Sequence, residues 1–368
     1  MTAIFDMTDD IGPEKVIHIN TPRAGLQAIV VVDNTAIGAA IGGVRMAPDA
    51  DLEECMRLAR AMSLKNAAAG LPHGGAKAVI IADPSMPMAE KHSLICAFAR
   101  AIDQITDYIP GPDMGTDETC MAWVRNETGR AVGLPRVIGG IPLDEIGATG
   151  HGVAVAAGVA QDFGGVALDG ARVAVQGYGA VGRHAAHRLA DKGARIVAVA
   201  DSHGTAFHAT GFDLARLDAL KAAGQSVTDY PGADGAARGA IITADCDILI
   251  PSARPDVINS SNADGIKANL IIEGANIPAT ADAEKALHKR GVLVIPDFIA
   301  NAGGVICAAV EYRGGTQAEA MTIIASKISE NTRDMLQIVK DTGALPRDAA
   351  RKLAEARLQE AMSLQRLF

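Results

Sequence analysis

The stretch ARVAVQGYGAVGRHAAHRLADKGARIVAVAD, residues 171–201, decides the fold of this 368-residue chain. Its pattern predicts a short apolar strand over 171–177, a helix that begins within GYGAVG (177–182), and a second strand over 194–201. GYGAVG matches the pattern G-x-G-x-x-G, and Asp201 ends the second strand. A strand, a glycine turn, a helix and an acidic residue in this order predict a dinucleotide-binding βαβ unit.

Each part of GYGAVG has a physical role in holding a dinucleotide. Gly177 permits the tight turn, Gly179 lets the backbone approach the pyrophosphate, and Gly182 lets the helix pack closely on the strand. The backbone N–H groups at the start of the helix, at Ala180 and Val181, are expected to hold phosphate oxygens. The alternative is a tight strand-to-helix turn without a ligand.

Asp201 bears on the choice of cofactor. Its carboxylate is expected to accept hydrogen bonds from the adenine ribose hydroxyls and to repel a 2′-phosphate, which favours NAD over NADP. Two alternatives stay open. Asp201 could be an ordinary strand-end acid, and the following Ser202 and His203 could tolerate a phosphate.

The rest of the chain predicts two α/β domains on either side of a glycine-rich passage at 139–152. The first domain covers residues 1–145, and the second, over 146–329, has strands separated by helices, which predicts a parallel doubly wound sheet of the Rossmann type. Helices at about 330–368 are expected to fold back on the first domain. The predicted elements are strands at 26–34, 76–83, 246–253, 269–275 and 291–297, a helix at 51–67, and helices over 317–368 with a break at 343–346.

Composition excludes several classes of partner. The net charge is −9, from 34 basic and 43 acidic residues, which argues against nucleic acid and anionic membranes. The sequence shows no signal peptide and no apolar run of the roughly 18 residues that a membrane span needs. Five scattered cysteines without a C-x-x-C pair argue against a zinc site or a disulfide framework. A reduced, cytoplasmic setting is expected.

A second glycine-rich segment, AAAGLPHGGAKA (67–78), contains Lys77 and superficially suggests a phosphate loop. A P-loop requires G-x-x-x-x-G-K-[ST]. Here Ala76 separates Gly75 from the lysine, and Ala78 stands where a hydroxyl should bind Mg²⁺. Since GYGAVG supplies a phosphate site of its own, Lys77 is available for chemistry.

Several collinear motifs resemble those of the Glu/Leu/Phe/Val amino-acid dehydrogenases, over roughly residues 40 to 312. They are GGVRM (42–46), MSLKNAAAGLPHGGAK (62–77), GPDMGT (111–116), ATGHGV (148–153), QGYGAVG (176–182), EGAN (273–276) and PDFIANAGGV (296–305). The resemblance implies NAD(P)-dependent, reversible oxidative deamination of an L-amino acid to a 2-oxo acid and ammonia. It also implies that the first domain binds substrate and forms a homo-oligomer, and that a cleft between the domains closes during hydride transfer.

The resemblance also assigns roles to individual residues. Lys65 corresponds to the lysine that binds the substrate α-carboxylate, Lys77 to the catalytic lysine, and Asp113 to its acid/base partner. Lys77 would polarise or deprotonate the water that attacks the iminium carbon, and Asp113 would move protons to and from the substrate nitrogen. On the residues alone, both lysines could equally be solvated and Asp113 could be a turn residue. Further candidates to hold the nicotinamide or the substrate amine are Thr149, Asn276 and Asn301, each of which could instead be a cap or turn residue.

The expected side-chain pocket is apolar. Glutamate-specific members carry a lysine where this chain has Ile41, and tend to have a serine where it has Ala308, so a buried γ-carboxylate would lack partners. These two residues, with Met62 and Val305, favour a leucine, valine or phenylalanine substrate. Size cues conflict, because Gly111 would enlarge the pocket and Val305 is more leucine-like. Gly43 of GGVRM is also assigned to the substrate site.

Two histidines depart from the family pattern, His73 in LPHGGAK and His151 in TGHG. Both are interpreted first as hydrogen-bonded structural residues. If His73 reaches the substrate, a polar amino acid becomes the alternative. The competing hypotheses are therefore a glutamate dehydrogenase that recognises the γ-carboxylate through His73 or a partner subunit, and a catalytically silent NAD-binding regulator.

Overall fold

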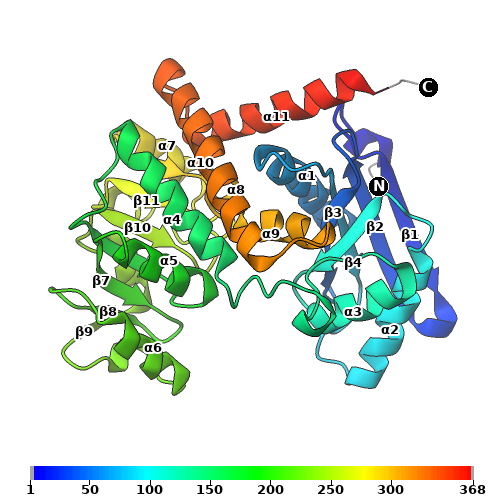
Figure 1. Cartoon of the computed structure of the whole chain (residues 1–368), viewed down its shortest axis with the longest axis horizontal. Helices are drawn as coiled ribbons and strands as arrows, with labels where there is room; N and C mark the ends of the chain where they lie inside the picture. Colours follow the sequence, from blue (N-terminus) through cyan, green and yellow to red (C-terminus); the bar gives the residue numbers. More distant parts are fainter. Residues whose placement is uncertain (1–3, 366–368) are drawn as a thin grey trace. The chain divides into compact units, whose positions relative to one another are not determined.

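The computed structural model describes residues 4–365, which form two compact units, each built on its own sheet (Figure 1). Unit 1 contains residues 4–142, 305–320 and 351–365, and unit 2 contains residues 143–304 and 321–350. The chain thus enters unit 2 within the predicted glycine-rich passage. It passes between the units again after Gly304, Ala320 and Ala350.

Unit 1 is a five-stranded sheet in the order β1-β2-β4-β3-β5 with helices on both faces. The pairs β1/β2 and β2/β4 are antiparallel, whereas β3 is parallel to both β4 and β5. Its elements are η1 (Ile4–Met7), β1 (Lys15–Thr21), η2 (Pro22–Ala24), β2 (Leu26–Asn34), β3 (Ala40–Met46), α1 (Leu52–Ala68), β4 (Gly75–Ile80), α2 (Met88–Ala101), β5 (Tyr108–Pro112), α3 (Glu118–Thr128) and η3 (Arg136–Ile138), with most of α9 (Gly303–Tyr312) and α11 (Pro346–Leu364).

Alternation along β2 explains why both faces of the unit 1 sheet are covered. Ile29 and Val31 pack with Cys55 and Ala59 of α1, while the intervening Val30 belongs to a larger cluster on the opposite face. Successive strand residues point to opposite faces, so a strand this apolar must be covered twice. Helices α2 and α3, which lie side by side in Figure 1, cover that second face.

Unit 2 has a seven-stranded sheet in the order β12-β11-β10-β6-β7-β8-β9. The five strands from β12 to β7 pair in parallel, and β8 and β9 extend the sheet antiparallel. Its elements are α4 (Ala148–Ala160), η4 (Gln161–Phe163), β6 (Arg172–Gln176), α5 (Ala180–Ala190), β7 (Arg195–Ala200), β8 (Thr205–Phe207), α6 (Leu214–Ala222), η5 (Val227–Asp229), β9 (Asp234–Ala236), η6 (Arg238–Thr243), β10 (Ile248–Pro251), η7 (Ala263–Gly265), β11 (Leu270–Ile272), α7 (Ala281–Lys289), β12 (Leu293–Ile295), α8 (Asp297–Ala300) and most of α10 (Gln317–Thr342).

The predicted fold class is confirmed: two α/β units, the second with a parallel Rossmann-type sheet on which carboxyl strand ends share one edge. The predicted strands at 26–34, 171–177 and 194–201 correspond to β2, β6 and β7. Strands β1, β3 and β5 have no counterpart among the predicted elements. β3 contains two glycines and β5 two prolines, residues that weaken the strand pattern in a sequence.

The last helices divide differently from the prediction that residues 330–368 complete the first domain. Residues 321–350 of α10 and the start of α11 pack in unit 2, and unit 1 regains the chain only from Arg351. Two contacts explain the difference. Ile328 of α10 packs against Gly152 of α4, where an added Cβ would lie 2.5 Å from its Cδ1, and Arg347 forms ion pairs within unit 2.

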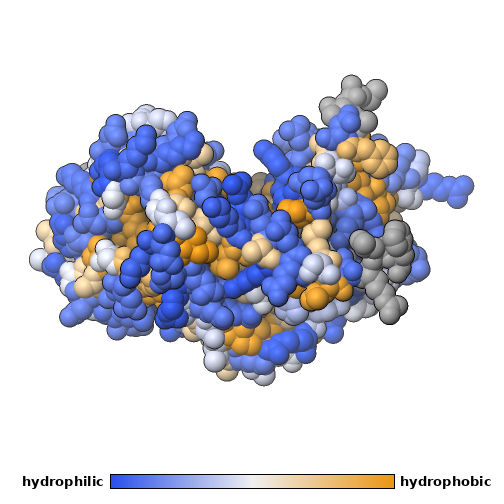
Figure 2. Space-filling view, turned by 90° about the horizontal axis from the view of Figure 1, so that it is seen from above, coloured by the Kyte–Doolittle hydropathy of each residue, from blue (hydrophilic) through white to orange (hydrophobic). Residues whose placement is uncertain are grey.

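The outer surface is mostly hydrophilic, and on the face seen in Figure 2 hydrophobic residues form smaller patches among charged and polar ones. Among the helices of residues 4–365, none has the length and apolar character that a membrane span requires.

Candidate active site

Lys77 lies on β4 with its side chain on the face of the unit 1 sheet that α1 covers. The alternation places it there, because the preceding Ala76 and following Ala78 belong to the cluster on the other face. The side chain is buried, with 6% of the residue exposed, and Nζ lies 2.7 Å from Oδ2 of Asp113, directly after β5. The structure therefore brings together the two predicted catalytic residues as an ion pair between a buried lysine and a half-buried aspartate.

Glycine 43 makes room for this pair. It lies on β3, between β4 and β5, and an added Cβ would lie 2.9 Å from Cβ of Asp113 and 3.2 Å from Nζ of Lys77. Any side chain at this position would push into the ion pair. The close approach of two charged groups thus depends on a missing side chain on the strand between them.

Arg45, which the sequence analysis did not single out, is a second cation at Asp113. Its Nε donates to Oδ2 of Asp113 at 3.0 Å, and its Nη1 pairs with Glu54 of α1. Arg45 follows Gly43 by two residues on β3, so both face the same side of the sheet. The period-2 alternation of a strand could have identified it, but β3 itself was not predicted.

The cations determine the ionisation of Asp113. Burial by itself raises the pKa of this carboxyl, but the charge and hydrogen bond of Lys77 and the charge of Arg45 outweigh burial, so its pKa lies below the ordinary value. The backbone N–H of Asp113 also donates to Oγ1 of Thr116, which fixes the GPDMGT turn. Asp113 is therefore held as a carboxylate.

The glycines of LPHGGAK serve packing rather than phosphate binding. An added Cβ on Gly75 would lie 2.0 Å from the backbone nitrogen of Ser63, so α1 and β4 approach as closely as their backbones allow. Asn66 of α1 donates through Nδ2 to the carbonyl of Gly74 at 2.7 Å. These contacts seat β4, and with it Lys77, against α1.

His73 has a structural environment. It is 9% exposed, Nδ1 lies 3.1 Å from the carbonyl oxygen of Ala39, and its ring meets Tyr312 of α9 edge-on at 5.8 Å between centroids. Burial lowers its pKa, against the hydrogen bond to Ala39. The pKa of half-buried His151 on α4 is also lowered, chiefly by burial and then by the charge of Arg188. Neither environment favours an imidazolium.

The remaining residues expected at the substrate come from several elements of unit 1. Ile41 is buried on β3, two residues before Gly43 and on the same face, while Met62 and Lys65 are half-buried on α1, the lysine in its last turn. Val305 and Ala308 are half-buried on α9.

Gly111 does not simply enlarge a pocket, as the sequence suggested. A Cβ added there would lie 3.1 Å from Cγ2 of Val132, so this buried valine already occupies the neighbouring space. Val132 is fixed by its backbone N–H, which donates to the carbonyl of Pro110 on β5. The space beside Gly111 is therefore limited by Val132.

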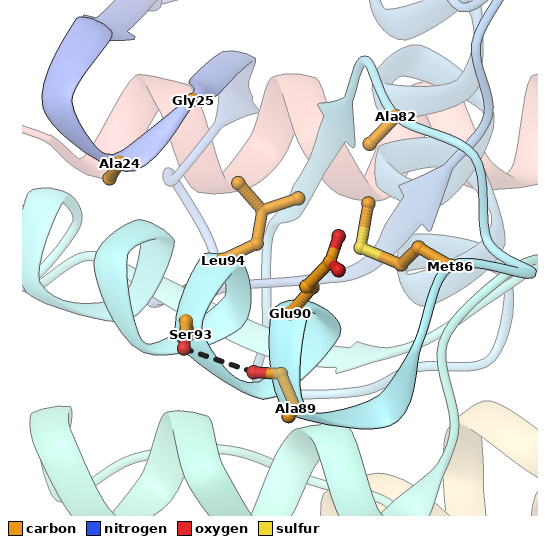
Figure 3. A pocket seen from close by; sticks show the side chains of 8 residues that line it. All are labelled: Ala24, Gly25, Ala82, Met86, Ala89, Glu90, Ser93 and Leu94. Atoms are coloured by element: carbon orange, nitrogen blue, oxygen red, sulfur yellow. Dashed lines mark hydrogen bonds between the residues drawn. The ribbon is translucent and has the colours of Figure 1, made fainter.

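Unit 1 also has a groove of about 520 Å³ that is separate from these residues. Figure 3 shows its lining, which comes from the end of η2 and the turn before β2, the segment after β4, and α2, and is mainly apolar. Of its polar groups, the Ser93 hydroxyl donates to the carbonyl of Ala89 at 3.0 Å, and the Glu90 carboxylate is the charged one. The lining contains none of the predicted site residues, and it offers no acid/base pair.

In unit 2 the glycines of GYGAVG have the geometry that a dinucleotide needs. Gly177 directly follows β6 with φ of +96°, in the left-handed region, and a Cβ added there would meet Ala253 at 2.6 Å. An added Cβ on Gly182 would lie 2.0 Å from the carbonyl oxygen of Gly177, so α5 packs tightly on the turn. Gly179 is the N-cap of α5, and the cap has no side-chain hydrogen bond. Gly179 and Ala180 are both exposed, as an anion-binding helix start requires. Val181 is half-buried.

The Asp201 carboxylate is fully occupied by the protein. Oδ2 accepts from Nζ of Lys221 at 2.8 Å and the backbone N–H of Val227 at 2.9 Å. Oδ1 accepts from the Ser226 hydroxyl at 3.1 Å and the backbone N–H of His203 at 2.9 Å. Four donors fill the roughly four acceptor positions of a carboxylate. The side chain is 8% exposed, so it serves to tie β7 to α6 and η5.

These donors also set the charge at Asp201. Burial by itself would raise its pKa, but the Lys221 ammonium and the two backbone N–H groups outweigh burial and hold the pKa well below the ordinary value. The negative charge is thus permanent near neutral pH and is balanced by Lys221 at 2.8 Å.

The three remaining cofactor candidates lie in two places within unit 2. Asn301 donates through Nδ2 to Oδ1 of Asn276 at 3.0 Å, and its own Oδ1 is buried without a hydrogen-bond partner. Thr149, in the first turn of α4, lies against the start of α9, where a Cβ added to Gly304 would be 3.4 Å from its Oγ1. An unpartnered buried acceptor such as Asn301 Oδ1 is a candidate to bind a ligand donor.

Comparison with known proteins agrees with the two-unit α/β fold. Residues 139–366 match the model of the Glutamate/Leucine/Phenylalanine/Valine dehydrogenase family, and residues 13–130 match its Glu/Leu/Phe/Val dehydrogenase dimerisation domain. Among curated proteins, a glutamate dehydrogenase of Aeropyrum pernix is 38% identical over 90% of this chain and 84% of its own length. An NADP-specific glutamate dehydrogenase of Saccharolobus shibatae is 37% identical over 82% of this chain and 75% of its own length.

Among solved structures, the hetero-hexameric glutamate dehydrogenase of Thermus thermophilus, in a leucine-bound form, is similar with a TM-score of 0.84. It is 29% identical, and the match covers 97% of this chain and 91% of that one. The two family matches cover parts of both units, and the Thermus structure matches nearly the whole chain. The chain belongs to the Glu/Leu/Phe/Val dehydrogenase family of amino-acid dehydrogenases.

Proposed function

We propose that the protein catalyses the reversible oxidative deamination of an L-amino acid, with Lys77 and Asp113 as its acid/base pair. The observation that supports this proposal best is the contact of 2.7 Å between Nζ of the buried Lys77 and Oδ2 of Asp113. A solvated surface lysine would need neither burial nor Gly43 as a space-making neighbour. A silent cofactor-binding regulator would have no use for the pair.

The residues of unit 2 fit a nicotinamide dinucleotide. The exposed start of α5 and the open space beside Gly179, where an added Cβ would meet no atom within 4 Å, suit a pyrophosphate. The unpartnered Oδ1 of Asn301 suits an amide donor such as the nicotinamide carboxamide. When bound, the dinucleotide accepts the hydride from the substrate Cα.

The chain's own residues then manage water and protons. Lys65 binds the α-carboxylate of the substrate. Lys77 first passes its ammonium proton to Asp113, 2.7 Å away, and as the neutral amine then takes a proton from the water that attacks the iminium carbon. Asp113 carries protons to and from the departing nitrogen, which leaves as ammonia. Because Asp113 is held as a carboxylate by two cations, it is ready to accept a proton near neutral pH.

The first candidate substrate is L-glutamate. The relatives named above are glutamate dehydrogenases, and they match most of this chain. In this chain the γ-carboxylate would need an atypical partner, because Ile41 and Ala308 cannot supply one. His73 is a poor choice, since it is buried and burial lowers its pKa.

The second candidate is an apolar amino acid of the leucine, valine or phenylalanine type. The observation that favours it is Ile41, which is 3% exposed and lies on the same face of β3 as Gly43 and beside the catalytic pair. A carboxylate against this side chain would lose its hydration without a compensating hydrogen bond.

For the cofactor, we propose that the protein uses NAD and discriminates only weakly against NADP. The expected preference for NAD over NADP requires a free Asp201 carboxylate that repels a 2′-phosphate. Its charge is instead balanced by Lys221, and its acceptor positions are filled. The exposed Ser202 and His203 next to it leave room for a phosphate.

We also propose that the protein works as a homo-oligomer assembled through unit 1. The match to the dimerisation domain at residues 13–130 supports this, and the similar Thermus enzyme is oligomeric too, as a hetero-hexamer.

The test is an absorbance assay of the reduced cofactor, with NAD⁺ or NADP⁺ and single L-amino acids at alkaline pH. Turnover with glutamate, and none with leucine, valine or phenylalanine, supports the first candidate; the reverse supports the second. Ile41→Lys sharpens the result, because it should add glutamate turnover only if the wild-type pocket is apolar. No turnover with any amino acid in the wild type would contradict the proposed activity.

A further inference from the structure

An ionic cluster in unit 2 has no part in the reaction as proposed. Arg347, in the first turn of α11, pairs with three carboxylates, and we call these four residues the Arg347 cluster. Its Nη2 lies 2.7 Å from Oε2 of Glu273, its Nε 2.7 Å from Oε1 of Glu284, and its Nη1 2.8 Å from Oδ1 of Asp297. One side chain thus joins the end of β11, helix α7 and the start of α8.

The cluster is buried, so its geometry is closely constrained. The three carboxylate side chains are at most 8% exposed, and burial raises the pKa of Glu273 and of Glu284 against the opposing charge of Arg347. A single guanidinium faces three acids, and only its planar fork of donors can serve all of them at once. These three ion pairs therefore fix Glu273, Glu284 and Asp297, and the elements that carry them, relative to Arg347.

Asp297 links the cluster to the loop after β11. While Oδ1 accepts from Arg347, Oδ2 accepts from the backbone N–H of Ile277 at 2.8 Å. Ile277 has φ of +47°, a left-handed conformation that a β-branched residue adopts only under constraint, and its side chain is exposed. The hydrogen bond from Ile277 to Asp297 is therefore one of the contacts that hold this strained residue in place.

This loop lies against the dinucleotide motif. A Cβ added to Gly274 would lie 3.1 Å from Cγ1 of Val181 in GYGAVG. Asn276 precedes the strained residue, and its Oδ1 accepts from Nδ2 of Asn301 at 3.0 Å. Asn301 is tied to the same cluster, because its backbone N–H donates to the carbonyl of Asp297 at 2.7 Å. Asn301 is thus one hydrogen bond away from Asp297, and Asn276 is next to Ile277, which is hydrogen-bonded to Asp297.

We propose that Arg347 and Asp297 are positioning residues for the nicotinamide end of the cofactor. Arg347 orients Asp297, and Asp297 holds Ile277 and Asn301 so that the paired side chains of Asn276 and Asn301 face the ligand. This inference rests on the proposed function, since it takes these asparagines as contacts of the nicotinamide.

The test compares Asp297→Asn with the matched control Glu284→Gln, using the full-length protein. Each variant replaces one carboxylate partner of Arg347 by its amide, but Glu284 has no contact with the loop among the hydrogen bonds that join the cluster. The dissociation constants of NADH and of ADP-ribose, which lacks the nicotinamide, are measured by fluorescence titration and calorimetry. We expect Asp297→Asn to weaken NADH binding about tenfold and ADP-ribose binding less than twofold, and Glu284→Gln to change neither by more than twofold.

Arg347→Lys gives a second measurement, because one ammonium can keep the charge but cannot reach all three carboxylates. We expect it to weaken NADH binding several-fold and again to spare ADP-ribose. Equal loss of both ligands, or equal effects of Asp297→Asn and Glu284→Gln, would show a merely structural cluster and overturn the inference. The binding measurements need no amino acid, so a wild type that binds NADH without deaminating any amino acid would refute the proposed function alone.

Discussion

The face of unit 1 that carries Lys77 and the GYGAVG turn of unit 2 both depend on glycine, but for different physical reasons. At Gly43 the missing side chain makes room for other side chains, since an added Cβ would press on Lys77 and Asp113. At Gly177 the backbone itself requires glycine, with φ of +96°, and at Gly179 the backbone is left exposed. Unit 1 thus uses glycine to bring charged side chains together, and unit 2 uses it to present backbone N–H groups.

This difference predicts which kind of substitution should disrupt the function proposed for each unit. Where side chains do the chemistry, truncating one of them should stop turnover and leave ligand binding in the other unit unchanged. Where the backbone is expected to bind the pyrophosphate, a side-chain change at the neighbouring Asp201 should alter cofactor selectivity more than affinity. The predictions below test this separation, beginning with the change expected to have the largest effect.

Lys77→Ala should reduce kcat by about 10²–10⁴-fold, the range typical of losing a general acid/base. The physical reason is that the variant loses the amine proposed to take the proton from the attacking water, and Asp113 loses the cation 2.7 Å away. Steady-state kinetics with the preferred amino acid measures the loss. The dissociation constant of NADH, measured by fluorescence titration, should stay within about twofold of the wild-type value, since Lys77 and GYGAVG belong to different units.

A loss of NADH affinity comparable to the loss of turnover would contradict the separation of the two glycine-rich segments. It would revive the hypothesis that AAAGLPHGGAKA holds a phosphate. Full activity in the variant would remove Lys77 from the mechanism altogether.

Much of this separation could be predicted from the sequence. GYGAVG is a local motif, because its turn, helix start and preceding strand are contiguous, and β6 and α5 form where expected. The pairing of Lys77 with Asp113 followed from the family resemblance rather than from local pattern. The structure then adds the reason, which is the parallel order β4-β3-β5 with Gly43 between the two residues.

Other features could not be predicted because they depend on segments that are distant in the sequence. Asp201 ends its strand as expected, but its four donors arise when η5 and α6 fold back on β7. Val132 fills the space beside Gly111, and Arg347 reaches Glu273 from 74 residues away. No periodicity or motif encodes such contacts, which form only through tertiary packing.

Arg45→Gln should shift the acid limb of the pH profile of kcat/KM to higher pH by about one unit, since losing a nearby opposite charge changes a pKa by about 1–3 units. The sign follows from the pKa of Asp113, which Lys77 and Arg45 hold below the ordinary value. Removing one cation raises that pKa, so Asp113 is protonated at a higher pH and activity falls there sooner. At alkaline pH the variant should approach wild-type kcat/KM, as measured over the full pH range.

The control is Glu54→Gln, which removes the other partner of Arg45 and leaves its bond of 3.0 Å to Asp113. This variant should keep the wild-type acid limb. An identical shift in both variants would mean that the geometry of α1, rather than the charge at Asp113, sets the profile. A uniform loss of activity at all pH values in Arg45→Gln would lead to the same conclusion.

Lys221→Ala should have the smallest effect, and it examines the side chain that balances the charge of Asp201. Without its ammonium, Asp201 carries an unbalanced negative charge beside the ribose site, and a 2′-phosphate is repelled. We expect kcat/KM to fall roughly fivefold to tenfold with NADP⁺, and less than twofold with NAD⁺, where tenfold corresponds to about 1.4 kcal/mol. Parallel losses with both cofactors would show that Lys221 only supports the fold around β7. If kcat/KM with NAD⁺ and kcat/KM with NADP⁺ both stayed at their wild-type values, the 2′-position would lie away from Asp201. Cofactor choice would then depend on backbone geometry, as is expected of pyrophosphate binding.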